Sequence, residues 1–410
     1  PRRLEIGQAT AFKNYYTRMV VTMQYRHSIP TIVECGAGIA GRAGEFLKNH
    51  GAKNVFVVTD QGIRNAGLLD PVLRSLEENG LKYDIFDKTV PDPSAESVME
   101  GLDQLRRQPH DHIVALGGGS SIDTAKGIAI MAVNKGHILD YEGVNKIPRP
   151  GLPVVAIPTT AGSGSEVTAS TIITNLKTSF KAAVISPYIF PKAALLDPAL
   201  TLKLPQELTS ATGMDALTHA IESYTSKTST PFSRALAIEA VRIIARNIRK
   251  AYFVGSDLES RERMLVASAM AGMAFSQSRL GNVHAISHTL GGVFHIPHGV
   301  ANAALLPYVM MYNLPACPEK MKDIAEALGC RVDGLSPTEA GERAVHAVAE
   351  LNRTLNIPSN LRELGVDLKA LPKLVEDAMR SGNVLVNPRW TRPSDIEKII
   401  RNAYEGNLSS

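Results

Sequence analysis

Along the first half of the chain, short runs rich in β-branched residues alternate with stretches that have the apolar spacing of amphipathic helices. Several of these stretches end at a glycine, which is a common helix stop. Such alternation is typical of a parallel β-sheet covered by helices. We therefore expect strands within 31–38, 54–60, 82–87, 112–120 and 154–160, and helices within 41–51, 68–80 and 94–108.

The pattern changes near residues 201–209. Beyond that point β-branched runs nearly disappear, and stretches rich in Ala, Met, Leu and Glu follow helical periodicity, as at 233–252 and 261–277. The sequence therefore predicts an α/β domain at residues 1–205 and an all-helical domain at residues 206–410. Residues 1–30 show no clear period, and we expect an extension that packs on the body of the protein or on a neighbouring subunit.

The overall composition is that of an ordinary folded protein. The 410 residues are 44% hydrophobic and 20% charged, which permits a large core and excludes a disordered chain. Basic residues exceed acidic ones by only 44 − 40 = 4 and form no block. Since aromatic residues make up only 5% of the chain, few side chains can stack on bases, and we expect no nucleic-acid partner. We expect a small-molecule substrate, and the mildly basic charge balance is compatible with an anionic one.

Cysteine use and hydropathy bear on location. Cys35, Cys317 and Cys330 form no CxxC pair, and we expect them to be reduced thiols. The first residues lack the apolar centre of a signal peptide, and no apolar run approaches the roughly 18 residues of a membrane span. These features predict a cytoplasmic protein with no membrane partner.

Two loops rich in glycine and hydroxyl side chains each follow a predicted buried strand. The loop at 117–126 is GGGSSIDTAK, and its glycines would let backbone N–H groups approach a phosphate at a helix N-terminus. The loop at 158–168 is PTTAGSGSEVT. Either loop alone is compatible with a simple turn. Because the carboxyl ends of parallel strands meet at one edge of a sheet, the two together predict a dinucleotide-binding crevice.

Asp60 ends the second predicted strand. A carboxylate there can accept hydrogen bonds from ribose hydroxyls and would repel a 2′-phosphate, which favours NAD(H) over NADP(H). The alternative is that Asp60 serves only as a turn residue or a helix cap.

The clearest chemical pattern lies in the helical half. Asp215 and His219 are four residues apart, as are His284 and His288, so each pair lies on one helical face. His298 follows a glycine break, and we expect it on a loop. One carboxylate with several imidazoles suits a divalent first-row metal such as Zn²⁺ or Fe²⁺. The sequence has no Gly-x-Ser-x-Gly motif, which would indicate a serine nucleophile. It also has no Walker-type lysine, which would indicate phosphoryl transfer from ATP.

Taken together, these motifs resemble the iron-containing (group III) alcohol dehydrogenases over about residues 30–405. The resemblance rests on the two loops and on segments 197–224, 284–292, 298–309 and 387–389. It implies a Rossmann-like, NAD-binding α/β domain followed by a helical domain, which is the dehydroquinate synthase-like fold, with the metal and the nicotinamide between them. It also implies a homodimer or a larger homo-oligomer.

The resemblance also implies roles for individual residues. The family's metal ligands fall on Asp215, His219, His284 and His298, and its additional histidine, near the substrate and the proton path, falls on His288. The cofactor contacts it implies are Asp60, Asp92, Gly118, Gly119, Ser120, Asp123, Thr159, Thr160, Ser163, Thr168, Lys181 and Leu200. The implied cofactor is NAD(H). The implied metal is Fe²⁺, with Zn²⁺ and Mn²⁺ as alternatives.

Two positions depart from the family pattern. Ser163 stands where threonine is usual, which keeps the hydroxyl. Arg279 stands where a small residue is usual, five positions before His284 and close to Phe275, which matches a wall of the substrate pocket. The Arg279 guanidinium either faces the substrate, where it would bind an anionic head group, or points away to the surface.

We therefore expect a metal-dependent, NAD(H)-linked alcohol dehydrogenase or aldehyde reductase for a short-chain substrate, with sulfoacetaldehyde as an anionic example. The metal would supply Lewis-acid polarisation of the substrate oxygen, and the nicotinamide would exchange hydride with the substrate carbon. Two other classes stay open, a metal- and NAD-dependent lyase or cyclase of the same fold and a non-catalytic binding protein. NADH consumption with small aldehydes distinguishes them.

Overall fold

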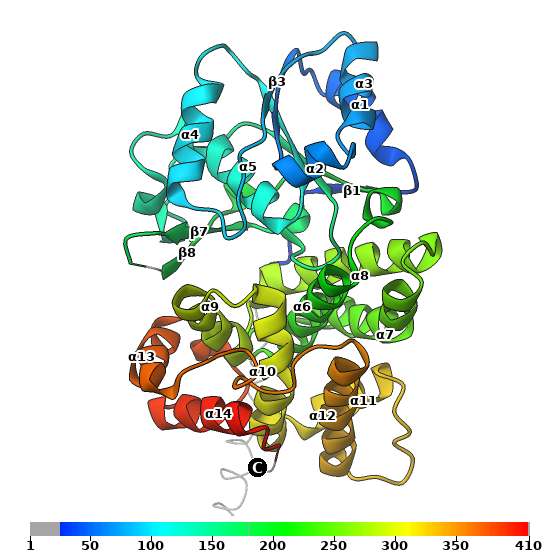
Figure 1. Cartoon of the computed structure of the whole chain (residues 1–410), viewed down its shortest axis with the longest axis vertical. Coiled ribbons are helices and arrows are strands. Elements are labelled where there is room, and N and C mark those ends of the chain that lie inside the picture. Colours follow the sequence, from blue (N-terminus) through cyan, green and yellow to red (C-terminus); the bar gives the residue numbers. More distant parts are fainter. Residues whose placement is uncertain (1–24, 179, 409–410) are drawn as a thin grey trace, which may run out of the picture.

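The computed structural model describes residues 25–178 and 180–408. The chain forms an α/β part and a helical part, which lie one above the other in Figure 1. Most of the predicted extension, residues 1–24, lies outside the described residues. Its described end lies on the helical part, where the His27 ring stacks on Phe232 at 5.3 Å and Gln277 Nε2 donates to the Ser28 carbonyl at 2.9 Å.

A six-stranded parallel sheet forms the centre of the α/β part. Its spatial order is β1-β9-β6-β4-β2-β3. The strands are β1 (Ile32–Cys35), β2 (Asn54–Val58), β3 (Lys82–Phe86), β4 (His112–Gly117), β6 (Val154–Pro158) and β9 (Ala193–Leu196). The five strands that the sequence predicts are present, and the parallel α/β fold class is confirmed.

Helices cover both faces of this sheet. Along β2, Phe56 and Val58 pack with α4 and α5, whereas Val55 and Val57 pack with α1 and α3. Burial on both faces explains why the strands are continuous apolar runs rather than alternating ones. The helices are α1 (Ala43–Asn49), α2 (Gln61–Asn65), α3 (Asp70–Glu78), α4 (Ala95–Leu105) and α5 (Gly119–Val133).

The strand order reverses between β2 and β4. From β2 the chain moves outward to β3, returns to β4 on the other side of β2, and continues to β6. The carboxyl ends of β2 and β4 therefore flank a topological switch point, which is where open α/β sheets bind ligands.

A second, three-stranded sheet has the order β5-β8-β7 and consists of β5 (Gly143–Val144), β7 (Ser170–Asn175) and β8 (Phe180–Ile185). The sequence analysis predicted none of these strands, nor β9. The four residues of β9 are Ala-Ala-Leu-Leu, which contain no β-branched side chain and suit a buried helix equally well. Pairing with β6 and β1 makes this segment a strand.

The helical part begins with α6 (Gln206–Thr225), and residues 206–408 contain no strand. The further helices are α7 (Pro231–Phe253), α8 (Leu258–Ser278), α9 (Asn282–Phe294), α10 (His298–Asn313), α11 (Pro318–Ala327), α12 (Pro337–Thr354), α13 (Leu371–Arg380) and α14 (Pro393–Glu405). The helical composition is confirmed, while a division into two folding units at residue 205 stays a prediction. Within the described residues, no helix has the length and hydropathy to cross a membrane.

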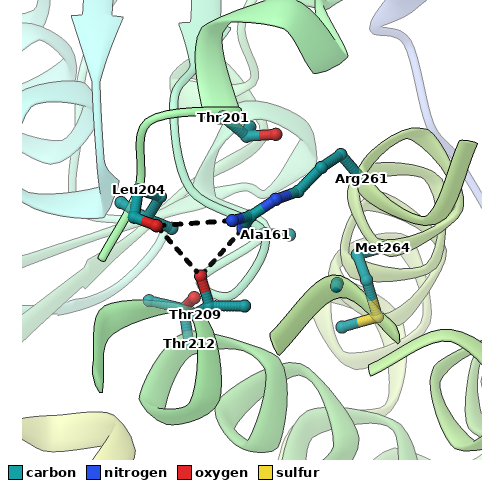
Figure 2. Close-up of a pocket in the computed structure, with 8 residues that line it drawn as sticks. Ala161, Thr201, Leu204, Thr209, Thr212, Arg261 and Met264 are labelled. Carbon is teal, nitrogen blue, oxygen red and sulfur yellow. Dashed lines mark hydrogen bonds between the residues drawn. The ribbon is translucent and has the colours of Figure 1, made fainter. Parts of the chain in front are cut away.

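A buried arginine holds the connection between the two parts. Arg261 of α8 donates to the Leu204 carbonyl at 3.3 Å, to Thr209 Oγ1 in α6 at 2.8 Å and to the Gly255 carbonyl at 2.9 Å. Figure 2 shows the guanidinium between Leu204 and Thr209, beside a cavity of about 10 Å³, which is room for about one water molecule. Arg261 thus ties the start of helix α6 to the segment that enters it.

Candidate active site

Four side chains from three helices meet at one point. Asp215 and His219 lie one turn apart on α6, His284 lies in the first turn of α9, and His298 begins α10. The Nε2 atoms of the three histidines lie 3.8, 3.9 and 3.7 Å from Asp215 Oδ1, and all four ligand atoms lie within 4.8 Å of one another. Atoms bound about 2.0–2.2 Å from a shared ion lie up to about 4.4 Å apart, so only small movements are needed to bind one.

The other ring nitrogens of two of these histidines are fixed by acceptors. His284 Nδ1 lies 2.6 Å from Glu222 Oε2, and His219 Nδ1 lies 3.2 Å from the Gly162 carbonyl. Because a carboxylate and a carbonyl accept, each Nδ1 carries the proton, and each Nε2 turns its lone pair toward Asp215. Burial lowers the pKa of His284 well below its usual value, with the neighbouring His219 adding to the effect. The neutral imidazole that binds a metal is therefore the stable form.

Glu222 is a functional residue that the sequence analysis missed. It is 3% exposed, and its Oε1 accepts from the Val283 N–H at 2.7 Å while Oε2 accepts from His284. Burial raises the pKa of Glu222 to about 7, and three backbone N–H groups oppose that shift. Its spacing was a usable signal, because 215, 219 and 222 share one face of a helix.

Asn302 is a second missed residue. Its Nδ2 donates to Asp215 Oδ1 at 2.7 Å and lies 3.1 Å from both His284 Nε2 and His298 Nε2. Its Oδ1 and His298 Nδ1 are buried without a hydrogen-bond partner among the described residues. One carboxylate and three imidazoles form a donor set that fits a divalent first-row metal.

The position of His298 corrects one expectation. It is the first residue of α10 rather than a loop residue. Gly299 explains why the helix can begin there, since a Cβ at this position would lie 2.3 Å from the Ala211 carbonyl oxygen of α6. The glycine lets α10 approach α6 closely enough for His298 to reach Asp215.

His288 lies next to the four-residue cluster and outside it. Its ring stacks on His298 at 5.3 Å and meets His284 edge-on at 5.9 Å. Burial lowers the pKa of His288 well below its usual value, and the positive charge of Lys181 contributes. His288 is therefore neutral at pH 7.

The predicted cofactor loops lie at the switch point. Asp60 Oδ1 accepts from the Ile63 N–H at 2.9 Å and so caps α2, while Oδ2 accepts from Ser121 Oγ at 3.2 Å. The helix-cap role of Asp60 is thus present in the structure, and the Asp60 carboxylate lies beside the turn that begins α5. A Cβ added to Gly117 would lie 3.4 Å from Asp60 Oδ2.

The two loops touch each other at this edge. A Cβ on Gly118 would lie 3.5 Å from Thr160 Oγ1, and a Cβ on Gly119 would lie 2.8 Å from Ser163 Oγ. Gly118, Gly119 and the partly exposed Ser120 form the N-terminus of α5, where free N–H groups favour an anion.

Other predicted cofactor residues are buried. Asp123 accepts from Ser165 Oγ and from the Ile172 N–H, and Thr168 Oγ1 accepts from Lys126. Thr159 and Leu200 are 3% and 6% exposed. The structure therefore brings Asp123 and Thr168 together under the loops rather than on their surface.

Lys181 and Asp92 form an ion pair of 2.6 Å between β8 and the loop after β3. Lys181 also approaches α9, since a Cβ on Gly291 would lie 3.3 Å from its Nζ. This pair lies where the α/β part meets the helix that carries His288.

Of the two predicted substrate residues, Phe275 lies at the cluster, with its ring stacked on His219 at 4.5 Å. Arg279 is exposed, and its guanidinium makes no hydrogen bond or ion pair with the described residues. Its guanidinium lies against Gly382, where a Cβ would be 2.2 Å from Nη2. Its φ of 60° and ψ of −173° are adopted almost only by glycine.

Comparison with curated proteins places close relatives over nearly the whole chain. A 1,3-propanediol dehydrogenase of Citrobacter freundii is 44% identical over 387 residues, covering 93% of this chain and all of that protein. An NAD-dependent methanol dehydrogenase of Bacillus methanolicus is 44% identical over 375 residues, covering 92% and 98%.

Solved structures agree. A 1,3-propanediol oxidoreductase superposes with a TM-score of 0.91 at 43% identity, over 93% of this chain and all of that one. A sulfoacetaldehyde reductase of Bifidobacterium kashiwanohense in complex with NAD⁺ is more distant, with a TM-score of 0.84 at 28% identity over 93% and 99%. The family model for iron-containing alcohol dehydrogenase matches residues 30–198, and the model for the C-terminal part of the Fe-containing family matches residues 209–404. The chain belongs to the iron-containing alcohol dehydrogenase family.

Proposed function

We propose that this protein is an NAD(H)-linked, divalent-metal-dependent dehydrogenase of short-chain alcohols, which also reduces the corresponding aldehydes. The observation that carries the proposal is the convergence of the ligand atoms of Asp215, His219, His284 and His298 within 4.8 Å of one another. Family membership supports the reaction class, and the methanol- and propanediol-acting relatives support a small substrate.

The four clustered side chains would hold the cation, for which Fe²⁺, Zn²⁺ and Mn²⁺ are the candidates. A bound cation supplies Lewis-acid polarisation of the substrate oxygen, and a bound nicotinamide exchanges hydride with the substrate carbon. Glu222 keeps His284 in the tautomer that presents Nε2. Phe275 gives the site an apolar wall next to His219, which excludes water and strengthens its electrostatics.

His288 is the residue we assign to the proton. It is neutral at pH 7, adjoins His298, and lies near the Lys181–Asp92 pair. In the oxidation direction it would accept the hydroxyl proton, directly or through water, and in the reduction direction it would return it.

For the cofactor, Gly118, Gly119 and Ser120 would bind the pyrophosphate at the α5 N-terminus, with Thr160 and Ser163 on the facing loop. Asp60 would accept from the adenosine ribose and disfavour NADP(H). Asp123 and Thr168 would act from beneath, by fixing the loop.

The exposed guanidinium of Arg279 supports a second candidate substrate, a short aldehyde that carries an anionic group. An exposed guanidinium in a strained backbone conformation, one turn beyond Phe275, can bind the anionic group of an aldehyde such as sulfoacetaldehyde. The closer similarity to propanediol- and methanol-acting proteins favours a neutral alcohol instead.

The test is a set of assays on protein loaded separately with Fe²⁺, Zn²⁺ or Mn²⁺. We expect NADH formation from 1,3-propanediol or methanol, and NADH consumption with propionaldehyde or sulfoacetaldehyde. Absorbance at the NADH band measures both. Absence of turnover with every loaded metal would contradict the proposed function.

A further inference from the structure

A buried lysine lies beneath the predicted cofactor loops. Lys126 is on α5 and is 1% exposed. Its Nζ donates to Ser165 Oγ at 2.8 Å, to Thr168 Oγ1 at 3.0 Å and to the Ser170 carbonyl at 2.9 Å. An ammonium group has three donors, so every N–H of the Lys126 ammonium is used on residues 165–170, which end at the first residue of β7.

Carboxylates complete this buried group. Asp123 lies 3.9 Å from Lys126 Nζ and accepts from Ser165 Oγ, and Glu166 is 1% exposed nearby. Burial lowers the pKa of Lys126 to about 8 and raises that of Glu166 to about 7. Replacing buried charges by apolar residues of similar volume often leaves the free energy of unfolding unchanged or raises it. Stability alone therefore does not explain why Lys126, Asp123 and Glu166 are charged residues.

Hydrogen bonds connect Lys126, through Ser165, to Ser163, which contacts the glycine turn at residues 117–120. Ser165 donates its backbone N–H to Ser163 Oγ at 3.2 Å, and Ser163 lies directly against Gly119, whose Cβ would approach it to 2.8 Å. Lys126 and Gly119 belong to the same helix. A closed path therefore runs from α5 through Ser165 and Ser163 back to the start of α5.

We propose that Lys126 is a positioning residue for the cofactor site, which holds the loop 158–168 at a fixed distance from the turn 117–120. This inference rests on the proposed NAD(H)-linked function. The phosphate-binding groups of both loops are then preformed, and binding NAD(H) does not have to order them. The metal cluster does not depend on Lys126, because none of its bonds goes to α6, α9 or α10.

The test is the NADH affinity of metal-loaded Lys126→Met, measured by the change in NADH fluorescence on titration. We expect the Kd for NADH to rise about tenfold or more, while bound metal per chain and the KM for the alcohol at saturating NAD⁺ stay unchanged. Lys135→Met, an exposed lysine just after the same helix, is the matched control and should leave the Kd unchanged.

A second variant guards against misfolding of the first. Ser165→Ala removes the hydroxyl that joins Lys126 to Asp123 and should raise the Kd by a smaller factor. A folded Lys126→Met or Ser165→Ala with wild-type NADH affinity would overturn the role of Lys126, and so would equal loss of NADH and metal binding. Wild-type protein that binds no NADH would instead refute the proposed function.

Discussion

At the scale of single residues, the candidate site differs from its sequence pattern mainly in what surrounds the ligands. His284 is oriented by Glu222 and His219 by the Gly162 carbonyl, whereas Asn302 holds Asp215. Outer partners of this kind fix the ring orientation and the tautomer of a ligand. We therefore expect metal binding to depend more on the four proposed ligands than on His288.

Replacing His284 by Ala removes one of four proposed ligands and leaves Glu222 buried without its imidazole partner. We expect at least a tenfold weaker metal affinity and loss of activity together. His288→Ala should keep its metal and lose turnover, because it lies outside the cluster. Elemental analysis of the purified variants, alongside turnover, measures both effects. Equal metal loss in the two variants would show that the histidines are assigned wrongly.

Asp60 has two roles that one pair of substitutions separates. Asp60→Asn keeps an oxygen that can cap α2 but removes the charge, so we expect better use of NADPH relative to NADH with little change in stability. Asp60→Gly should add a stability loss of a few tenths of a kcal/mol. The ratio of kcat/KM for the two cofactors measures the charge effect. Wild type that uses both equally well would contradict the role of Asp60.

Arg279→Ala tests the anionic substrate. Alanine keeps the same unfavourable φ, so the comparison isolates the guanidinium. If Arg279 binds the anion, kcat/KM for sulfoacetaldehyde should fall by about 1.5–3 kcal/mol, or tenfold to a hundredfold, while that for propionaldehyde stays nearly constant. Equal effects on the two substrates, or none, would assign Arg279 to the surface.

At the scale of elements, one loop connects the two candidate sites. Loop 158–168 touches the turn of α5 at Ser163, and the Gly162 carbonyl in this loop accepts from His219 of α6. A Cβ on Gly162 would lie 2.7 Å from Thr212 of α6, so only glycine permits this approach. The loop also contains the buried carboxyl group of Glu166, which makes the stability of the protein depend on pH.

The pKa of Glu166 determines whether stability rises or falls with pH. Its pKa is about 7 when folded and 4.5 ordinarily, because burial disfavours the carboxylate. Between those values the folded state holds a proton that the unfolded state has released, so stability falls as pH rises from about 4.5 to 7. Glu166→Gln should remove this slope and add on the order of 1–3 kcal/mol above pH 7.

Thermal unfolding midpoints of wild type and Glu166→Gln, measured from pH 5 to 8, check this expectation. The exposed Glu376→Gln is the control and should follow the wild-type curve. Parallel curves for wild type and Glu166→Gln would show that Glu166 does not titrate in this range.

At the scale of the whole molecule, the two parts are joined by side chains as well as by the chain itself. Arg261 is the main example, since it binds the entering segment, α6 and the loop after α7 without a carboxylate partner among the described residues (Figure 2). Its loss would remove the donor to the Gly255 carbonyl and to Thr209 Oγ1, and one of the two donors to the Leu204 carbonyl.

Arg261→Met should therefore lower the free energy of unfolding by about 2–4 kcal/mol. Arg261→Lys should recover only part of the loss, because an ammonium cannot reproduce the planar fork that reaches three acceptors. Denaturant unfolding measures the change, with the exposed Arg263→Met on the same helix as the control. A wild-type midpoint in Arg261→Met would exclude this anchoring role.

The sequence by itself indicated the class of fold and five candidate ligands, of which the family resemblance selected four. Strand periodicity, glycine turns and helical spacing are local properties, and the four-residue separations of Asp215 from His219 and of His284 from His288 follow from helix geometry alone. The local pattern also separated the parallel sheet from the helical part, because buried strands and amphipathic helices have different apolar periods.

Only the tertiary structure decided what depends on contacts between distant segments. It made the Ala-Leu run of β9 a strand by pairing it with β6 and β1, and it placed His298 at a helix start by packing Gly299 on α6. It also turned Asp123 inward to Ser165 and brought Glu222 and Asn302 to the ligands. These outcomes follow from burial and hydrogen-bond satisfaction across the fold, which no local spacing encodes.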